Sequence, residues 1–300
     1  MKKILYSALL IVALFGSVIA FSAFSNSPLA EKITGILPQV IKSIYIPEQI
    51  NFAGEIMPKN VDIEERLDRE LSVNAYWHSS TLLNIKRANK YLPKIERILA
   101  EEGIPDDFKY LAIAESGLRN VGSPAGARGY WQFMKLAARE YKLEVNSEVD
   151  ERLHLEKSTR AACKYLKYLH KRFGSWTNAA AAYNLGPTKF SSELRQQKEE
   201  SYYNLNLNQE TSRYVFRLIA LKEILKAPQN YGFYIDPHEK YQSNEDYYEV
   251  VVDKSVPDWA TFAKEKGISY RMLKYYNPWL IDSKLTVKSN VYKIRIPRNP

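Results

Sequence analysis

The sequence has very little of what metal, disulfide and nucleotide sites need. Its 300 residues include one cysteine, so no disulfide can form within the chain and no zinc site built from several cysteines is present. The four histidines, at positions 78, 154, 170 and 238, lack the spacing of paired metal ligands. No glycine-rich phosphate loop, internal repeat or low-complexity tract occurs. We therefore expect no cofactor.

The single cysteine, Cys163, lies on an apolar stripe with Ala162, Leu166, Leu169 and Phe173. This spacing predicts a buried structural thiol. Aromatic residues, in contrast, are plentiful: the chain has 22 Tyr and 5 Trp. Such a load is typical of carbohydrate-binding clefts, although core packing explains any single ring equally well.

The net charge is +9, which attracts anionic partners at long range. Acidic and basic residues alternate, however, as in Lys94, Glu96, Arg97 and Glu101, and this pattern is typical of solvated helix faces. No nucleic-acid-binding motif accompanies the charge, so we expect no nucleic-acid partner. A cell-wall polymer and a membrane surface both remain open.

The N-terminus has the pattern of an export signal, because Lys2 and Lys3 precede an uncharged stretch over residues 4–24. Val18-Ile19-Ala20 offers a cleavage site, yet the stretch is also about long enough to anchor the chain in a membrane. No cysteine stands directly after this stretch, so we expect no lipoprotein anchor. We expect a periplasmic or cell-envelope protein, either released or anchored in the membrane.

Changes in composition and periodicity divide the chain. Residues 1–24 form the signal or anchor, and the proline-punctuated residues 25–59 an irregular tether. Residues 60–228 are predicted to be almost entirely helical, and 229–245 to form a linker. Residues 246–298 predict the order strand, helix, helix, strand. Helices are expected at 62–79, 86–102, 107–116, 130–141, 157–173, 177–183, 209–226, 257–266 and 270–276, and strands at 247–252 and 291–296.

Glu115 is the strongest candidate for a chemical role. It ends the apolar run Tyr110-Leu111-Ala112-Ile113-Ala114, and Gly117 closes the helix behind it. A poorly solvated carboxyl has a raised pKa, so it can hold a proton near neutral pH and act as a general acid. On spacing alone, an ordinary surface residue at a helix end is the simpler interpretation.

Three motifs in a fixed order favour a chemical role for Glu115 over that of a surface residue. They are Glu115-Ser116, then Ser123 to Met134 (Ser-Pro-Ala-Gly-Ala-Arg-Gly-Tyr-Trp-Gln-Phe-Met), then Ala182-Tyr183-Asn184. Together they resemble the motifs of the soluble lytic transglycosylase family, especially its membrane-bound lytic murein transglycosylase D branch. The resemblance extends over about 61–228 and includes the segment Gln209 to Tyr214.

The resemblance implies a mainly α, lysozyme-like domain with Glu115 at the floor of a sugar-binding cleft. The residues implied to contact substrate are Ser116, Ser123, Gln132, Met134, Tyr183, Asn184 and Glu210. Two of these have simpler alternatives: Ser116 could bond locally, and Glu210 could serve the N-terminus of its helix. Gly126 and Gly129 are expected to permit sharp turns.

The implied reaction cleaves the β-1,4 bond between N-acetylmuramic acid and N-acetylglucosamine in peptidoglycan. Glu115 would act first as acid and then as base, giving a 1,6-anhydro product. Only one convincing carboxylate is present, which suits a route assisted by the substrate's own N-acetyl group. A hydrolytic muramidase and a catalytically idle wall-binding scaffold are the alternatives. We expect a monomer that acts on glycan strands.

Residues 246–298 resemble a LysM module, a small βααβ domain that binds glycans containing N-acetylglucosamine. The Asn277-Pro278 turn fits, but Asp253-Lys254-Ser255-Val256 replaces the usual Gly-Asp-Thr-Leu. A spacer or protein-docking role is the alternative. In the helical domain, Ser123 follows Glu115 one residue sooner than in many relatives, and Tyr130 replaces an aliphatic residue.

Overall fold

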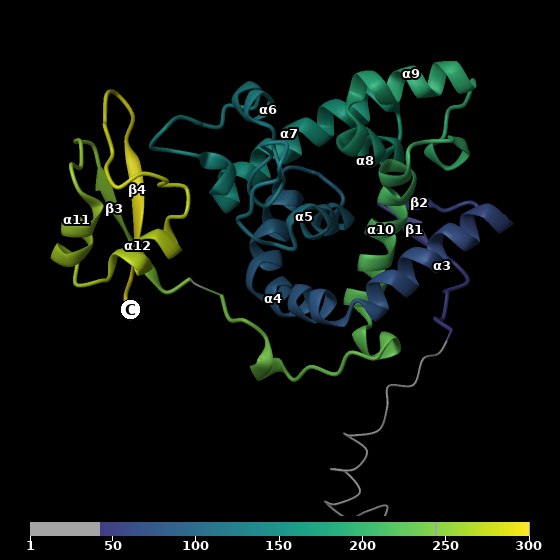
Figure 1. Cartoon of the computed structure of the whole chain (residues 1–300), viewed down its shortest axis with the longest axis horizontal. Coiled ribbons are helices and arrows are strands. Elements are labelled where there is room, and N and C mark those ends of the chain that lie inside the picture. Colours follow the sequence, from purple (N-terminus) through teal and green to yellow (C-terminus); the bar gives the residue numbers. More distant parts are fainter. Residues whose placement is uncertain (1–42, 244, 300) are drawn as a thin grey trace, which may run out of the picture. The chain divides into compact units, whose positions relative to one another are not determined.

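The computed structural model describes residues 43–243 and 245–299, and these are mainly helical, as predicted (Figure 1). Elements are numbered as in that figure. The predicted export signal over residues 1–24 lies outside the described residues, as does most of the tether. Within the part of the chain that the structure describes, no helix is both long and apolar enough to cross a membrane.

The first described segment is more ordered than the irregular tether we expected. Strands β1 (Asn51–Phe52) and β2 (Glu55–Ile56) form an antiparallel hairpin. Ala53 and Gly54 connect them with φ values of 53° and 83°, the backbone of a tight hairpin turn. Phe52 is fully buried, and its ring packs on Phe108. Residues 50–57 thus contribute to the main core.

Two helices follow with hardly a break, α3 (Val61–Tyr76) and α4 (His78–Glu101). The side chain of Asn60 accepts a hydrogen bond from the backbone of Ile63 and caps α3. Trp77, at ψ 61°, turns the chain into α4. Our prediction began the second helix at Lys86. It was wrong by eight residues, because His78 to Ile85 are rich in Ser, Thr and Asn, which have low helix propensity.

The remaining helices of this domain pack around one apolar core. They are α5 (Lys109–Ser116), α6 (Lys135–Glu140), α7 (Leu155–Phe173), α8 (Trp176–Leu185), α9 (Pro187–Gln197) and α10 (Gln209–Lys226). Short 3₁₀ turns occupy Asp106–Phe108, Glu151–Leu153, Tyr202–Asn204, Pro228–Tyr231 and Pro237–Glu239. Cys163 is buried on α7, as predicted, and burial raises the pKa of its thiol to about 12.

Two predictions for this region were wrong. Helix α9 was missed, although Pro187 at its first position favours a helix start. The helix predicted over 130–141 shrinks to α6, because Gln132 has a φ of 49°, which an α-helix cannot contain. The residues from Tyr130 to Met134 therefore form a loop beside the helices.

The C-terminal unit has the predicted βααβ order: β3 (Tyr247–Val252), α11 (Trp259–Glu265), α12 (Tyr270–Tyr276) and β4 (Tyr292–Pro297). The strands are antiparallel, with Tyr247 opposite Pro297 and Val252 opposite Tyr292. The buried Asn277 side chain binds the carbonyl of Leu273, and also both the carbonyl and the amide of Arg295. It thereby joins the end of α12 to β4.

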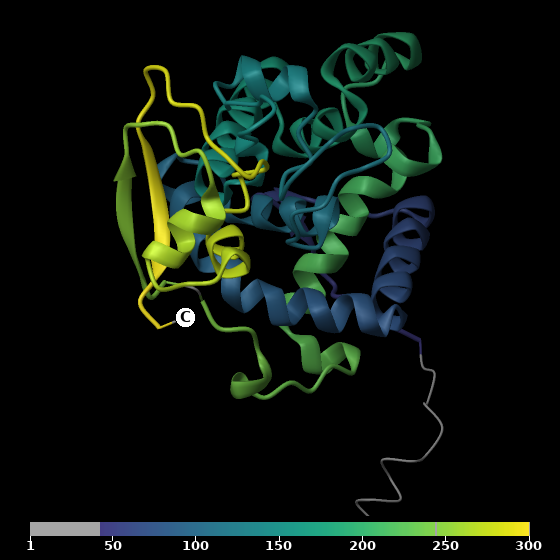
Figure 2. The same cartoon turned by 60° about the vertical axis from the view of Figure 1, so that its left-hand side comes forward.

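The C-terminal unit contacts the loop 144–154 of the helical domain (Figures 1 and 2). Val149 is fully buried in the core of the C-terminal unit and pairs with Leu280 as an isolated β-bridge. The amide of Asp150 donates to the Trp279 carbonyl at 2.8 Å, and the amide of Ile281 donates to the Glu148 carbonyl at 3.0 Å. Backbone hydrogen bonds thus join the two units.

Candidate active site

Helix α5 places Glu115 at the boundary between core and cavity. Residues Tyr110 to Ile113 of this helix are buried, and the helix ends at Gly117, whose φ of 59° reverses the chain. A Cβ at Gly117 would lie 3.0 Å from the Asn84 side chain, so both conformation and space favour glycine here. Glu115, near the end of the helix, is half-buried and faces a cavity.

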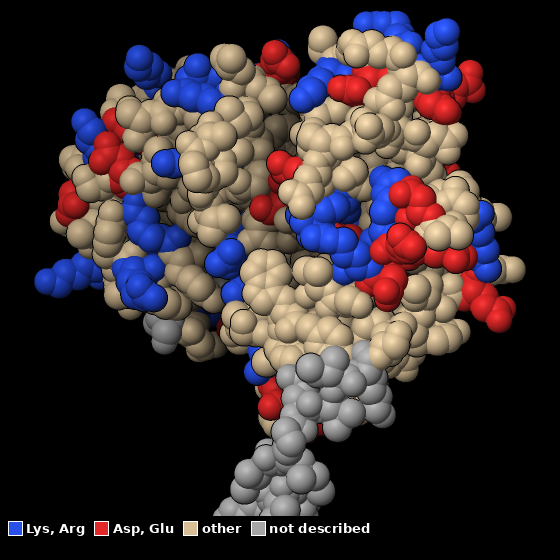
Figure 3. Space-filling model, turned by 45° about the vertical axis from the view of Figure 1, so that its right-hand side comes forward, with Lys and Arg blue, Asp and Glu red and all other residues tan. Residues whose placement is uncertain are grey.

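The Glu115 cavity has a volume of about 690 Å³ and lies among α3, α4, α5 and α10. Figure 3 shows a hollow on one face of the molecule, with acidic and basic side chains at its edge. Such a volume is in the range of sites that hold a small ligand or a few sugar rings. The polar and charged wall residues besides Glu115 are Glu70, Asn74, Ser79, Ser80, Asn84, Arg87, Ser116, Arg119, Arg213 and Arg217.

Burial raises the pKa of Glu115 to about 7. The Tyr214 hydroxyl donates to Glu115 Oε1 at 2.5 Å and opposes this shift, while the negative charge of Glu210 adds to it. The positive charge of Arg217 lowers the pKa. The carboxyl can therefore be both protonated and ionised near neutral pH, as a group serving as both acid and base requires.

Ser116 is buried and bonds within the chain. Its hydroxyl donates to the carbonyls of Ala112 and Tyr130, at 3.0 and 2.9 Å. It thereby attaches α5 to the loop that precedes α6. The structure thus shows the local hydrogen bonding that the sequence left open as an alternative for Ser116.

Ser123, Gln132 and Met134 do not line the Glu115 cavity. Ser123 accepts from the amide of Ala127, and the Gln132 amide donates to the carbonyls of Val121 and Gly129. Met134 is 48% exposed. The first two side chains fold the loop on itself, and the third faces solvent.

The glycines of this loop turn the chain, as predicted. Gly126 and Gly129 have φ values of 90° and 82°. A Cβ on Gly129 would lie only 1.9 Å from the Arg152 carbonyl oxygen, whereas a Cβ on Gly126 would meet nothing. Gly129 is therefore required by contact as well as by conformation.

Tyr183, Asn184 and Glu210 lie close to Glu115 without lining the cavity. Tyr183 donates to the Trp131 carbonyl at 2.7 Å, and burial raises its pKa, with a further rise from Glu115. The Asn184 amide donates to Glu210 at 3.3 Å and accepts from Thr211 at 2.8 Å. The structure thus groups these residues beside the acid, on α8 and α10.

Four charged or polar partners escaped the sequence analysis as site residues. Tyr214 contacts Glu115 directly, and Glu70 is fully buried in the cavity wall with Arg213 and Arg217. Arg213 Nε lies 2.5 Å from Glu70 Oε1, and Arg217 Nε 3.7 Å from Oε2. Arg213, Tyr214 and Arg217 follow Glu210 at spacings of three and four on one helix, and this spacing could have indicated that they share its face.

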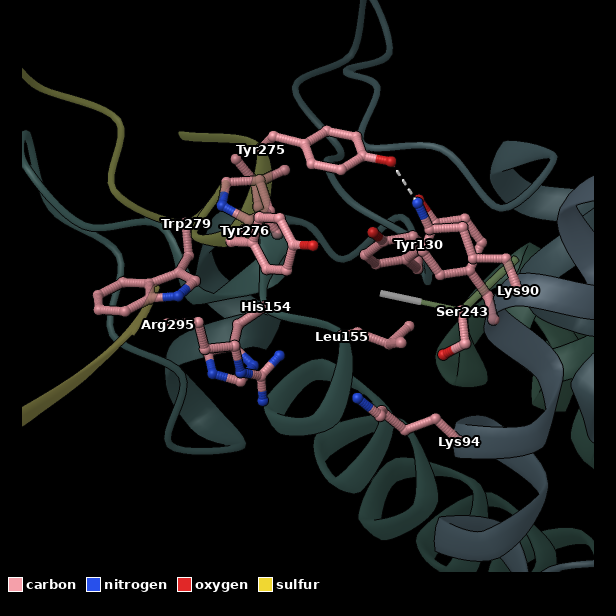
Figure 4. A pocket seen from close by; sticks show the side chains of 13 residues that line it. Lys90, Lys94, Tyr130, His154, Leu155, Ser243, Tyr275, Tyr276, Trp279 and Arg295 are labelled. Carbon is pink, nitrogen blue, oxygen red and sulfur yellow. Dashed lines mark hydrogen bonds between the residues drawn. The ribbon is translucent and has the colours of Figure 1, made fainter. Parts of the chain in front are cut away.

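A smaller cavity of about 70 Å³ lies between the helical domain and the C-terminal unit, and Lys94 and Arg295 point into it from opposite sides (Figure 4). Beside it, Glu156 lies 2.7 Å from Arg295, 3.0 Å from Lys94 and 3.2 Å from His154 Nδ1. Burial alone would raise the pKa of Glu156. The His154 ring and the Arg295 guanidinium outweigh it and hold the pKa well below its ordinary value.

The His154 side chain is 13% exposed, and desolvation lowers the pKa of its imidazole. Its ring packs on Trp279 of the C-terminal unit, and this contact indicates a structural role. Among residues 43–243 and 245–299, no group of three or more His, Cys, Asp or Glu side chains is arranged to hold a metal ion.

Two family models match the chain. Residues 83–206 match the transglycosylase SLT domain, and residues 248–300 match the soluble lytic transglycosylase C-terminal LysM-like domain. The second match agrees with the LysM resemblance of the C-terminal unit. The two models together include Glu115, the helices α11 and α12, the strand β4 and all of β3 except Tyr247.

Whole-chain comparisons agree. The membrane-bound lytic murein transglycosylase D of Escherichia coli (strain K12) is 30% identical over 249 residues, which are 81% of this chain and 53% of that protein. A putative tributyltin chloride resistance protein of Alteromonas sp. (strain M-1) is 28% identical over 160 residues, 52% of this chain and 77% of that protein. This chain thus spans about half the length of its transglycosylase D relative.

Among solved structures, the 70 kDa soluble lytic transglycosylase of Escherichia coli aligns with 51% of this chain and 26% of its own, at 21% identity and a TM-score of 0.39. The family matches carry the assignment. This chain has an SLT transglycosylase domain followed by a C-terminal LysM-like domain, and it is homologous to membrane-bound lytic murein transglycosylase D.

Proposed function

We propose that this protein is a peptidoglycan lytic transglycosylase, with residues 60–228 as its catalytic domain. It cleaves the β-1,4 bond between N-acetylmuramic acid and N-acetylglucosamine in the cell envelope. The observation that carries the proposal is a half-buried carboxyl in a large polar cavity, with a pKa of about 7, on a chain with an SLT domain. Substrate contact by Tyr183, Asn184, Glu210 and the loop from Ser123 to Met134 is part of the proposal.

In the first step, protonated Glu115 donates its proton to the glycosidic oxygen, and the bond to the anomeric carbon of the muramic acid breaks. The substrate's N-acetyl oxygen stabilises that carbon, which explains why one enzyme carboxylate suffices. In the second step, the ionised Glu115 takes the proton of the muramic C6 hydroxyl. The C6 oxygen then bonds to the anomeric carbon and gives the 1,6-anhydro ring, without consuming water.

The surroundings of Glu115 support both steps. Burial favours the protonated form needed first, and the Tyr214 hydroxyl favours the ionised form that follows. With a pKa near neutrality, neither form is costly to reach.

Product analysis tests the proposal. Purified sacculi incubated with the whole chain should release muropeptides that end in anhydromuramic acid, identified by mass spectrometry. Products that end in reducing muramic acid would instead identify a hydrolytic muramidase. No release of soluble fragments, together with retained binding to sacculi, would identify a wall-binding scaffold.

A further inference from the structure

Two arginines at the edge of the Glu115 cavity have no acidic partner in the part of the chain that the structure describes. Of the four arginines in the cavity wall, Arg213 and Arg217 pair with Glu70. Arg87 and Arg119 form no ion pair with any residue among 43–243 and 245–299. Arg87 donates to the Gly117 carbonyl at 3.3 Å, and Arg119 to the Ser116 carbonyl at 3.1 Å. Both guanidinium groups are thus held at the end of α5, next to Glu115.

The two guanidinium groups keep most of their hydrogen-bonding capacity for a ligand. Each has five N–H donors in a planar fork that suits a carboxylate. Burial and the neighbouring Arg119 lower the pKa of Arg87, so the two cations repel each other. A carboxylate placed between them would relieve that repulsion.

The same two arginines also line a second groove, which we call the side groove, with a volume of about 610 Å³. It adjoins the Glu115 cavity at Arg87 and Arg119 and runs toward Tyr275 of the C-terminal unit. Lys90, Tyr91 and Tyr241 form other parts of its wall. No Asp or Glu occurs among the described residues that line it. All charged residues that line the side groove are therefore cationic, and several tyrosines lie among them.

We propose that the side groove binds the carboxylate-bearing peptide branch of a peptidoglycan strand whose sugar chain occupies the Glu115 cavity. This inference rests on the proposed function. N-acetylglucosamine is neutral, and the lactyl group of a peptide-bearing muramic acid is an amide, so the free carboxylates of such a strand are on its peptides. A groove that branches from the reacting centre and has only positive wall charges fits a substituent of the strand better than its neutral backbone.

The test compares two substrates prepared from the same material: uncross-linked glycan strands bearing their peptides, and those strands after an amidase has removed the peptides. Cleavage by the whole chain is measured as kcat and KM on each. The variants are R87Q, R119Q and the double variant. R97Q is the matched control, because Arg97 is on the same helix as Arg87 but is exposed and lines neither the Glu115 cavity nor the side groove.

We expect the ratio of kcat/KM on peptide-bearing strands to that on bare strands to fall about tenfold or more in the double variant, mainly through KM. R97Q should leave the ratio as it is in the unchanged protein. The double lysine variant, R87K/R119K, should recover part of the ratio because it keeps the charge. Unfolding curves of each variant show whether it is folded.

Two results would overturn the inference. If the ratio of kcat/KM on the two substrates is unchanged in a folded double variant, the arginines only cap the end of α5. An equal rise of KM on both substrates would assign them to the sugar chain or to the lactyl carboxylate that the amidase exposes. Failure of the proposed function looks different, since the unchanged protein would then release no anhydro products from either substrate.

Discussion

Two half-buried glutamates of this protein, Glu115 and Glu156, have pKa values shifted in opposite directions. Glu115 faces a cavity, its one direct hydrogen-bond partner among the described residues is the Tyr214 hydroxyl, and burial raises its pKa to about 7. Glu156, at the contact with the LysM-like unit, is surrounded by Arg295, Lys94 and His154, and its pKa is held well below the ordinary value. Burial is common to both, and the presence of cations decides the protonation state.

The comparison distinguishes a chemical carboxyl from a structural one. A carboxylate whose charge is fully compensated stays ionised and joins elements together. A carboxylate with almost no compensating charge is destabilised by desolvation, and it therefore binds a proton more tightly. The following predictions test this difference, from the largest effect to the smallest.

Removing the proton carrier should have the largest effect. E115Q is expected to lower the rate of anhydromuropeptide release by about 10³-fold or more, because a positioned general acid contributes roughly 10²–10⁴-fold. The measurement is turnover on sacculi, with binding to sacculi recorded in parallel. E65Q, which replaces an exposed glutamate of α3, is the control. Normal turnover by E115Q would refute the mechanism.

Removing the structural carboxylate should act on stability instead. E156Q leaves Arg295 and Lys94 near one another without their shared counter-charge, so we expect a loss of about 3 kcal/mol in the free energy of unfolding. Urea unfolding at pH 7 measures it. The control E101Q removes an exposed partner of Arg160 and should cost less than about 1 kcal/mol. Equal losses in the two variants would contradict the prediction.

E115Q should stabilise the protein at alkaline pH. The pKa of Glu115 is higher in the folded chain than the ordinary value of 4.5, so the folded state binds more protons between those values and loses stability as pH rises from about 4.5 to 7. At pH 8 the variant, which carries no charge, should be more stable by up to about 3 kcal/mol. At pH 4 the advantage should vanish. An advantage of the same size at both pH values would argue for packing instead.

The smallest effect concerns Tyr214. Y214F removes a donor that favours ionised Glu115, so the pKa of the carboxyl should rise by up to about one unit. kcat/KM depends on the protonated acid and falls above its pKa. The alkaline limb of its pH profile should therefore move upward in Y214F. A limb that moves downward, or not at all, would show that the hydroxyl does not control this proton.

The sequence was informative wherever local patterns decide the structure. The apolar run before Glu115 and the Gly117 stop placed the acid near the end of α5, and the strand predicted over 247–252 coincides with β3. Trp77 and Gln132, whose backbones leave the helical region, lie where the sequence predicted that a helix continues.

The site was only partly predictable. Glu115, Tyr183, Asn184 and Glu210 lie near one another, and their contact with substrate stays a prediction. Arg87 and Arg119, however, are 32 residues apart and meet only because α4 passes the end of α5. Residues that meet from two different elements follow no helical or strand periodicity, so a single sequence does not reveal that they are neighbours.

Val149 has a consequence for how this chain could be rebuilt. It belongs by sequence to the helical domain and by packing to the heart of the LysM-like unit. A fragment that begins at residue 246 would lack Val149 and would have a cavity in its core. A different C-terminal domain fused at that point would need a pocket that accepts this side chain. The two units are therefore expected to be inherited, exchanged and lost as a pair.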